Sequence, residues 1–175
     1  TGNTGDNPFK KKEVRQALYQ AIDIEAIKKK VMRGLSEPAG IITFPGVNGY
    51  TADLDKRLPY DVNAAKKLLA DAGYPNGFDV ELRCPNDRYV NDEAICTAVV
   101  GMLGKIGVNV NLFAQTKSKH FKELKDDQGD FYMLGWGVPT LDSHYVFHYL
   151  YETGASWNKV NFSNADVDAA IRVME

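Results

Sequence analysis

The sequence predicts an α/β domain in which helices flank a central sheet that contains a βαβ unit. Two stretches, at about 78–82 and 108–112, alternate apolar and polar side chains with the two-residue period of a strand. Between them lies the longest stretch with helical periodicity. Such a crossover is nearly always right-handed and makes its two strands parallel. The composition agrees, because 44% apolar and 25% charged residues are usual for a globular domain with its own core.

The first part of the chain predicts two successive helices and a long loop. One helix face is marked by apolar residues at helical spacing: Val14, Ala17, Leu18, Ala21 and Ile22. Asp23 is placed to end this helix and to N-cap the next one, which contains Ile27 and ends at Gly34. Residues 35–60 are rich in glycine, proline and isolated apolar residues, so we expect an irregular loop that packs across the surface.

The middle of the chain predicts a third helix and then the βαβ unit. Asp61 is placed to N-cap this helix, which ends at Gly73. Its apolar face consists of Val62, Ala65, Leu68, Leu69 and Ala72. A turn at residues 74–77 leads into the first strand. Asn91 is placed to N-cap the long helix of the unit, and Gly107 is placed to end it.

The last part of the chain predicts a short helix near 118–127, one strand and two further helices. The run Phe131–Leu134 is continuously apolar, which is typical of a strand buried on both faces. Helical periodicity returns near 143–151 and again from 164.

Both ends of the chain indicate a piece of a longer protein. Residues 1–8 are typical of a loop and show no signal peptide, and the last helical face breaks off at Glu175 without a stop signal. We therefore expect a single α/β lobe over residues 1–175 with both chain ends truncated. No run of about 18 apolar residues is present, so no transmembrane helix is expected.

Charge and motifs argue against nucleic-acid binding and against catalysis. The formal net charge is −2 and no basic stripe is present, so nucleic acid is not an expected partner. No Gly-x-Ser-x-Gly elbow and no phosphate-binding glycine loop follows a predicted strand. Ser143 and His144 are neighbours in a predicted helix, where adjacent side chains point apart. We expect a protein that is not an enzyme and holds no cofactor or metal.

The segment that follows the predicted strand at 131–134 is the first candidate ligand site. Ligands of open α/β sheets bind beyond strand ends of this kind. Glycines on both sides of Trp136 permit close approach of a ligand, and the indole offers a broad apolar face with one donor. In the alternative, Trp136 fills the core and the glycines shape a turn. The candidate residues are Gly135, Trp136, Gly137, Val138, Pro139, Thr140 and Asp142.

The loop after the first strand of the βαβ unit is the second candidate ligand site, with Asn86, Arg88 and Tyr89. The guanidinium of Arg88 can hold a ligand carboxylate through two parallel hydrogen bonds. In the alternative, Arg88 is paired with Asp87 or Asp92, or it is simply solvated.

Two residue pairs leave their roles open. His144 and His148 lie four residues apart, a spacing that can place two imidazoles on one metal, with Asp142 near enough to be a third ligand. The alternative is two histidines without a metal. Cys84 and Cys96 are either two ordinary thiols or a disulfide between a strand end and the following helix. An oxidising compartment would allow the disulfide.

A series of motifs runs in order along nearly the whole chain. It begins with VRQAL at 14–18 and AID at 21–23, and continues with AKKLL at 65–69 and AGYPNGF at 72–78. It ends with NDRY at 86–89, IGV at 106–108 and LGWG at 134–137. In this order and spacing, the motifs resemble family 5 of the bacterial extracellular solute-binding proteins, which includes dipeptide-, oligopeptide- and nickel-binding proteins.

The resemblance implies the second lobe of a periplasmic binding protein of type II, with a central mixed sheet. It implies the extracytoplasmic, periplasmic component of an ABC importer, which captures peptides or related small solutes in a cleft between two lobes. The implied partners are such a solute, the transporter permease and the first lobe of the same chain, with the protein a monomer. In peptide-binding members, the backbone at the positions of Gly135, Trp136 and Gly137 pairs with the ligand main chain.

One departure from the family pattern bears on the ligand. Several peptide-binding members carry an aspartate three residues after this tryptophan, where it pairs with the α-amino group of the ligand. This chain has Pro139 there, which offers neither a carboxylate nor an N–H. Either Asp142 takes that role, or the ligand has no free ammonium at this place. Asp142 is alternatively the N-cap of the following helix. A metal complex or another non-peptide solute is the alternative ligand.

Overall fold

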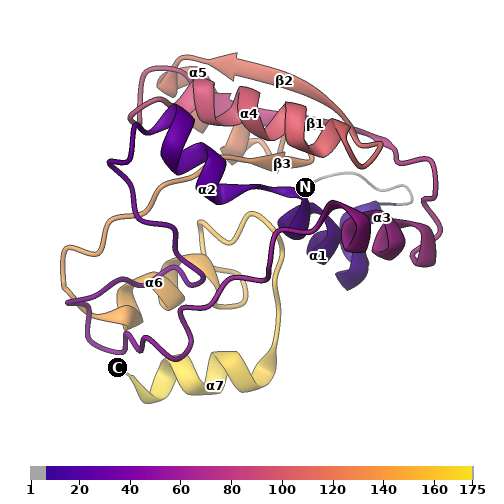
Figure 1. Ribbon diagram of the computed structural model, residues 1–175. Coiled ribbons are helices and arrows are strands. Elements are labelled where there is room, and N and C mark those ends of the chain that lie inside the picture. Colours follow the sequence, from indigo (N-terminus) through magenta and orange to yellow (C-terminus); the bar gives the residue numbers. More distant parts are fainter. Residues whose placement is uncertain (1–6, 175) are drawn as a thin grey trace. The chain divides into compact units, whose positions relative to one another are not determined.

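The computed structural model describes residues 7–174 (Figure 1). Within it the chain forms two compact units. The larger unit contains the chain up to Pro38 together with Leu58–Met133. The smaller unit contains Ala39–Arg57 together with the chain from Leu134 onward. Most of the loop that we predict at residues 1–8 lies outside the described residues.

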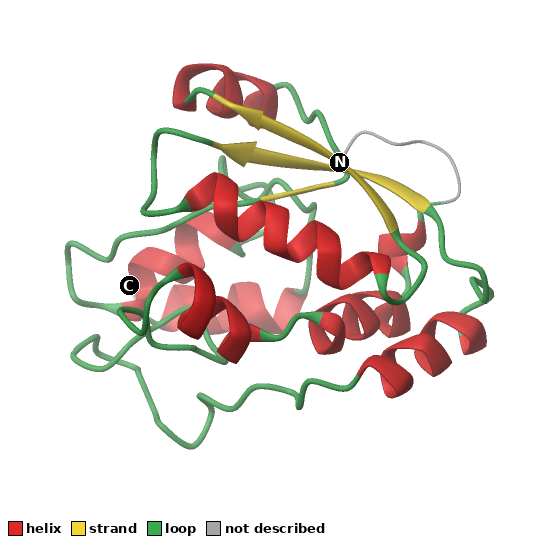
Figure 2. Ribbon diagram, turned by 45° about the horizontal axis from the view of Figure 1, so that its top comes forward, coloured by secondary structure: helices red, strands yellow, loops and turns green. Residues whose placement is uncertain are grey.

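The larger unit is built on a parallel sheet in the order β2-β1-β3, whose strands are yellow in Figure 2. β1 (Asp79–Pro85) lies between β2 (Asn109–Gln115) and β3 (Phe131–Tyr132). Helix α4 (Asp92–Gly104) connects β1 to β2, which confirms the predicted βαβ unit. The implied mixed sheet is not found among the described strands, because helical crossovers connect them and such connections make strands parallel.

β3 is shorter and less buried than the sequence predicts. The apolar run Phe131–Leu134 suggested a strand covered on both faces, but only Phe131 and Tyr132 pair with β1, and both are half-buried. β3 lies at the edge of the described sheet. The ladder also cannot continue, because the next donor on β1 would be Pro85, which has no N–H.

The N-terminal helices follow the predicted pattern. A short 3₁₀ turn, η1 (Pro8–Lys10), precedes α1 (Lys12–Ala21), and α2 (Ile24–Ala26) continues into the π-helical η2 (Ile27–Val31). Asp23 caps α2 by accepting a hydrogen bond from the amide of Ala26 at 2.9 Å. Burial of Val14, Ala17, Leu18 and Ala21 in the core confirms the predicted apolar face of α1.

Helix α3 (Val62–Asp71) packs with α1 in the same core. The carboxylate of Asp61 accepts a hydrogen bond from the amide of Ala64 at 2.9 Å, as predicted for an N-cap. Ala65 and Leu69 are buried, and they share one cluster with Leu82 of β1 and Leu103 of α4. The larger unit therefore has one continuous apolar core between its helices and one face of the sheet.

The N-terminus of α4 differs from the prediction. Asn91 adopts a left-handed conformation with φ of 56°, and its side chain donates to the carbonyl oxygen of Val31 at 3.0 Å, so it caps nothing in α4. The carboxylate of Asp92 instead accepts from the amides of Arg88, Tyr89 and Glu93 at 2.9–3.0 Å. A buried aspartate one residue later thus orders the preceding loop.

The smaller unit combines two helices with long irregular segments. Helices α6 (Ser143–Leu150) and α7 (Ala165–Val173) fall where the sequence predicts them, and α5 (Lys117–Lys125) of the larger unit does too. The core of the smaller unit contains Val47, Val138, Val146 and Leu150, with aromatic side chains packed around them. None of the helices in the described part of the chain is both long and apolar enough to span a membrane.

Candidate functional site

The segment between Leu134 and Asp142 combines one buried anchor with an exposed backbone. Val138 is buried in the core of the smaller unit, whereas Gly135, Gly137, Pro139 and Thr140 are exposed. A Cβ atom added at Gly137 would find no atom within 4 Å. The main chain at Gly137 therefore faces open space, as close approach of a ligand requires.

Trp136 packs among the aromatic side chains of the smaller unit. Its ring centroid lies 6.1 Å from that of Tyr145, 6.0 Å from that of Tyr149 and 5.9 Å from that of Trp157. The ring is half-buried, and its Nε1 is buried without a hydrogen-bond partner among the described residues. Trp136 therefore packs against the core of the smaller unit, and part of its side chain stays exposed.

Asp142 caps α6, which was one of the two roles left open by the sequence. Its Oδ1 accepts from the amide of His144 at 2.8 Å, and its Oδ2 accepts from Nδ2 of Asn48 at 2.8 Å. The bond from Asn48, then the amide of His144, lowers the pKa of Asp142, so the carboxylate is ionised. Both carboxylate oxygens are therefore already engaged within the chain.

Asn48 was not predicted to belong to the site. Its amide donates to the carbonyl oxygen of Leu141 at 2.8 Å, and its own carbonyl accepts from the amide of Ser143 at 3.0 Å. Gly49 has φ of 86°, and a Cβ there would overlap Oγ of Ser143, so only glycine fits. A lone asparagine in a loop rich in glycine gives no sequence signal for a contact 94 residues away.

His144 and His148 stack on one face of α6 with ring centroids 5.4 Å apart. Nδ1 of His148 lies 2.8 Å from Oε2 of Glu152, which follows it by one helical turn. Nε2 of His144 is buried without a partner among the described residues. In the part of the chain that the structure describes, no group of three or more His, Cys, Asp or Glu side chains is arranged to hold a metal ion.

The second candidate loop lies in the larger unit, and its backbone is well ordered by hydrogen bonds. The amide of Asn86 donates to the carbonyl oxygen of Gln115 at 2.8 Å, which extends the β1·β2 ladder by one bond. Asp87 accepts from the amide of Lys117 at the start of α5. Arg88 is exposed and lies over the Tyr89 ring, 5.1 Å from its centroid. Asp87 and Asp92 thus accept hydrogen bonds from backbone amides. Neither forms an ion pair with Arg88 among the described residues.

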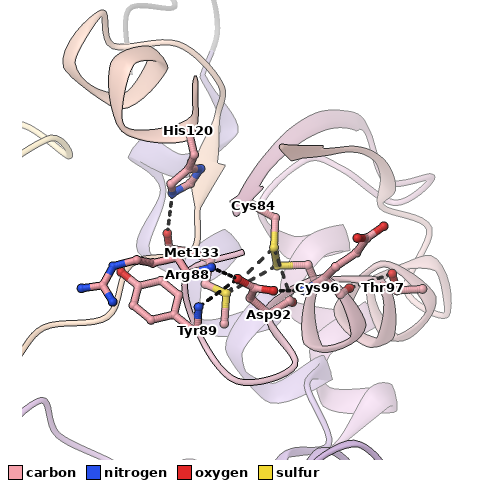
Figure 3. The surroundings of a disulfide bond; sticks show 9 residues. Cys84, Arg88, Tyr89, Asp92, Cys96, Thr97, His120 and Met133 are labelled. Atoms are coloured by element: carbon pink, nitrogen blue, oxygen red, sulfur yellow. Dashed lines mark hydrogen bonds between the residues drawn. A yellow bond between two sulfur atoms is a disulfide. The ribbon is translucent and has the colours of Figure 1, made fainter. Parts of the chain in front are cut away.

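A disulfide joins Cys84 at the end of β1 to Cys96 in α4 (Figure 3). This resolves the open role of the two cysteines in favour of the bond. Both residues are buried, and Sδ of Met133 lies 3.9 Å from one sulfur and 3.8 Å from the other. The bond joins residues 12 positions apart in the sequence, and the loop between them contains Asn86, Arg88 and Tyr89, so this loop is tied at both ends.

The chain matches the family model of the bacterial extracellular solute-binding proteins, family 5 Middle, over residues 1–158. This chain belongs to that family. The resemblance seen in the sequence motifs is thereby confirmed, and members of the family are solute-binding proteins of transport systems. The model that matches describes the middle part of such proteins.

Several characterised family members are similar to this chain. The dipeptide-binding protein of Escherichia coli strain K12 is 30% identical over 92% of this chain, which corresponds to 30% of that protein. The heme-binding protein A of Haemophilus influenzae is 29% identical over 97% of this chain and 32% of its own length. The chain thus spans about a third of the length of these relatives.

Solved structures agree in fold. A dipeptide-binding protein from Pseudoalteromonas sp. SM9913 in complex with Met-Leu gives a TM-score of 0.85 at 30% identity, over 94% of this chain and 34% of that one. The binding protein AgaA of A. tumefaciens R10 in complex with agropinic acid gives 0.81 at 30% identity, with the same coverage. The expected fold, a lobe of a periplasmic binding protein of type II, is confirmed.

The predicted ligand residues fall into two groups. Gly135–Thr140 and Asp142 lie in the smaller unit, where Val138 and Asp142 are held by core packing and by Asn48. Asn86, Arg88 and Tyr89 lie in the larger unit, next to the disulfide. Each group is brought together locally by its own unit.

Proposed function

We propose that this chain is part of the solute-binding component of an ABC importer, which captures a small peptide or a related solute and delivers it to a membrane permease. The match to the family model over residues 1–158 carries the proposal. The dipeptide-binding and oligopeptide-binding relatives support a peptide as the solute. The rest of the protein, including a first lobe, would complete the binding cleft, and the protein would act as a monomer without catalysing a reaction.

Within this chain, we assign ligand contact to the exposed backbone at Gly135, Trp136 and Gly137. Open space at Gly137 suits the pairing of two main chains, which gives affinity with little dependence on ligand side chains. The exposed part of the Trp136 side chain would contact apolar parts of the ligand. Arg88, exposed and outside the described ion pairs, would meet a carboxylate of the ligand.

A periplasmic location fits the disulfide. Buried disulfides persist in oxidising compartments and are rare in the bacterial cytoplasm. The Cys84–Cys96 bond therefore supports export of the protein across the inner membrane.

A non-peptide solute is the second candidate, and the surroundings of Asp142 favour it. Both oxygens of Asp142 accept hydrogen bonds from within the chain, and Pro139 has no carboxylate to offer an ammonium group. A ligand without a free amine at this place would suit the site better. The relative AgaA, whose structure contains agropinic acid, supports this candidate. The His144–His148 pair gives a metal complex no added support, since the described residues hold no group of three or more His, Cys, Asp or Glu side chains that could bind a metal ion.

Mass spectrometry of the ligand that co-purifies with the full-length protein tests both candidates. A peptide recovered in stoichiometric amount supports the first, and an amine-free organic acid supports the second. Calorimetry with the identified compound should then show at least tenfold weaker binding for Arg88→Ala if a carboxylate is held there, whereas Lys67→Ala on the exposed face of α3 serves as the control. Absence of any bound solute, together with no affinity for Met-Leu or agropinic acid, would contradict the proposal.

A further inference from the structure

His120 is a buried polar side chain that the proposed ligand contacts do not use. It lies on α5 between exposed lysines and is only 1% exposed. Its Nε2 lies 3.0 Å from the carbonyl oxygen of Met133, and a dashed line marks this hydrogen bond in Figure 3. Burial of an imidazole is unfavourable unless its N–H finds an acceptor. The bond to Met133 is therefore the reason that histidine is tolerated at this position.

The register of the sheet explains why the carbonyl of Met133 needs this donor. Arg83 pairs with Tyr132, and the amide of Met133 donates to the carbonyl oxygen of Arg83 at 3.0 Å. In a parallel ladder, the next bond would run from the amide of residue 85 to the carbonyl of Met133. Residue 85 is proline and has no N–H. His120 thus supplies the donor that the ladder lacks.

The chemistry of the partner fixes the state of the imidazole. A backbone carbonyl can only accept, so the proton of the neutral ring resides on Nε2. Nδ1 is buried without a partner among the described residues, which an acceptor nitrogen tolerates better than an unpaired N–H would. The neutral imidazole with its proton on Nε2 is therefore the form that fits this site.

Met133 is held at three points just before the candidate ligand segment. Its amide is bound by β1, its carbonyl by His120, and its sulfur lies against both cysteines of the disulfide. Met133 is also the last residue of the larger unit, and Leu134 is the first of the smaller unit in this part of the chain. The backbone leaves the sheet at this residue.

We propose that His120 is a positioning residue for the backbone at Met133, which directly precedes the segment Leu134–Gly137: its Nε2–H replaces the ladder bond that Pro85 cannot donate and fixes the chain at the point where it leaves the sheet. The role as a ligand-binding segment rests on the proposed function. The positioning itself does not, and it can be measured without a ligand.

Amide hydrogen exchange in the full-length protein tests the proposal. His120→Leu removes the donor at similar volume, and exchange at the amide of Met133, which donates to Arg83, should become about three to ten times faster, the effect of losing one net hydrogen bond. His120→Gln retains an N–H donor and should restore the slow exchange. In protein labelled with 5-fluorotryptophan, the ¹⁹F resonance of Trp136, assigned with Trp136→Phe, should shift in His120→Leu and return in His120→Gln.

A second variant separates the ladder argument from general loosening. Pro85→Ala returns an N–H to the ladder, so His120→Leu should have little effect on exchange when it is made in the Pro85→Ala background. Leu124→Ala, also buried on α5, weakens helix packing without touching the hydrogen bond and should leave exchange at the amide of Met133 unchanged. Three results would overturn the proposal. These are exchange accelerated as much by Leu124→Ala as by His120→Leu, exchange that stays fast in His120→Gln, and an undiminished effect of His120→Leu in the Pro85→Ala background. Recovery of a bound solute is a separate measurement, so either idea can fail alone.

Discussion

At the scale of single residues, Asp142 shows how a candidate binding group can be committed to structure. Its carboxylate caps α6 and pairs with Asn48, which ties the loop at 39–57 to the start of that helix. An N-cap and a ligand contact are hard to distinguish in a sequence, because both use an aspartate just before a helix. The geometry around the two oxygens is what separates them.

We predict that Asp142→Ala lowers the urea midpoint of unfolding, because it removes the cap and the Asn48 bond together. Asn48→Ala should lower the midpoint less, since the cap remains. In the double variant the two effects should be less than additive, because both variants lose the same Asn48–Asp142 bond. Fully additive effects would show that the bond contributes nothing to stability.

The pH dependence of stability should report on His120. Burial lowers the pKa of His120 below its ordinary value of 6.5, against the opposing bond to Met133 and the nearby charges of Glu123 and Asp92. The unfolded chain then takes up this proton at a higher pH than the folded chain. Stability is therefore lost as pH falls below about 6.5, until the lower folded pKa is reached. Urea unfolding can be measured between about pH 5 and 8, which brackets the ordinary pKa range of histidine. The loss of stability toward acid pH should be smaller in His120→Gln than in the parent protein.

At the scale of elements, the sequence predicts most helices and the βαβ unit, because periodicity reports directly on which face is buried. Val14, Ala17 and Leu18 illustrate this for α1. The failures occur where a long-range contact decides. β3 ends early because Pro85 on the neighbouring strand has no N–H to donate. The side chain of Asn91 donates to the carbonyl oxygen of Val31 and does not cap α4. Neither contact can be seen in local sequence.

The candidate site divides in the same way. Gly135–Gly137 and the loop at 86–89 were found from glycine, aromatic and arginine signals next to strand ends. The hydrogen bonds of Asn48 and His120 cannot be predicted from the sequence, because each depends on a partner brought close only by the fold.

The disulfide should stabilise the element pair β1 and α4. Replacing both cysteines, as Cys84→Ala/Cys96→Ala, should lower the free energy of unfolding by about 2–3 kcal/mol, as expected for a short closed loop in the chain-entropy model. Urea unfolding with and without a thiol reductant measures this effect. The double variant is its own control, because reductant should not change its midpoint. If the reductant did not change the urea midpoint of the parent protein, that result would argue against the bond.

At the scale of the whole molecule, this chain carries about a third of the length of its relatives. A protein usually buries roughly 70–90% of the surface of a small ligand that it binds. The isolated chain offers only part of the proposed cleft. We therefore predict that calorimetry of the isolated 175-residue chain with Met-Leu detects no binding of micromolar strength or better. Micromolar binding by this chain alone would show that it contains a complete site.

The pairing of Asn48 with Asp142 also sets an order of events during folding. The smaller unit draws on two stretches of chain, and the whole of Leu58–Met133 lies between them. A nascent chain that has emerged as far as Met133 already contains the larger unit, but only Ala39–Arg57 of the smaller one. Once Leu58–Met133 has folded, the loop that must close between the two stretches of the smaller unit is effectively shorter, and its closure loses less chain entropy. Collapse of the larger unit should therefore come first and bring residues 57 and 134 close enough for the smaller unit to assemble.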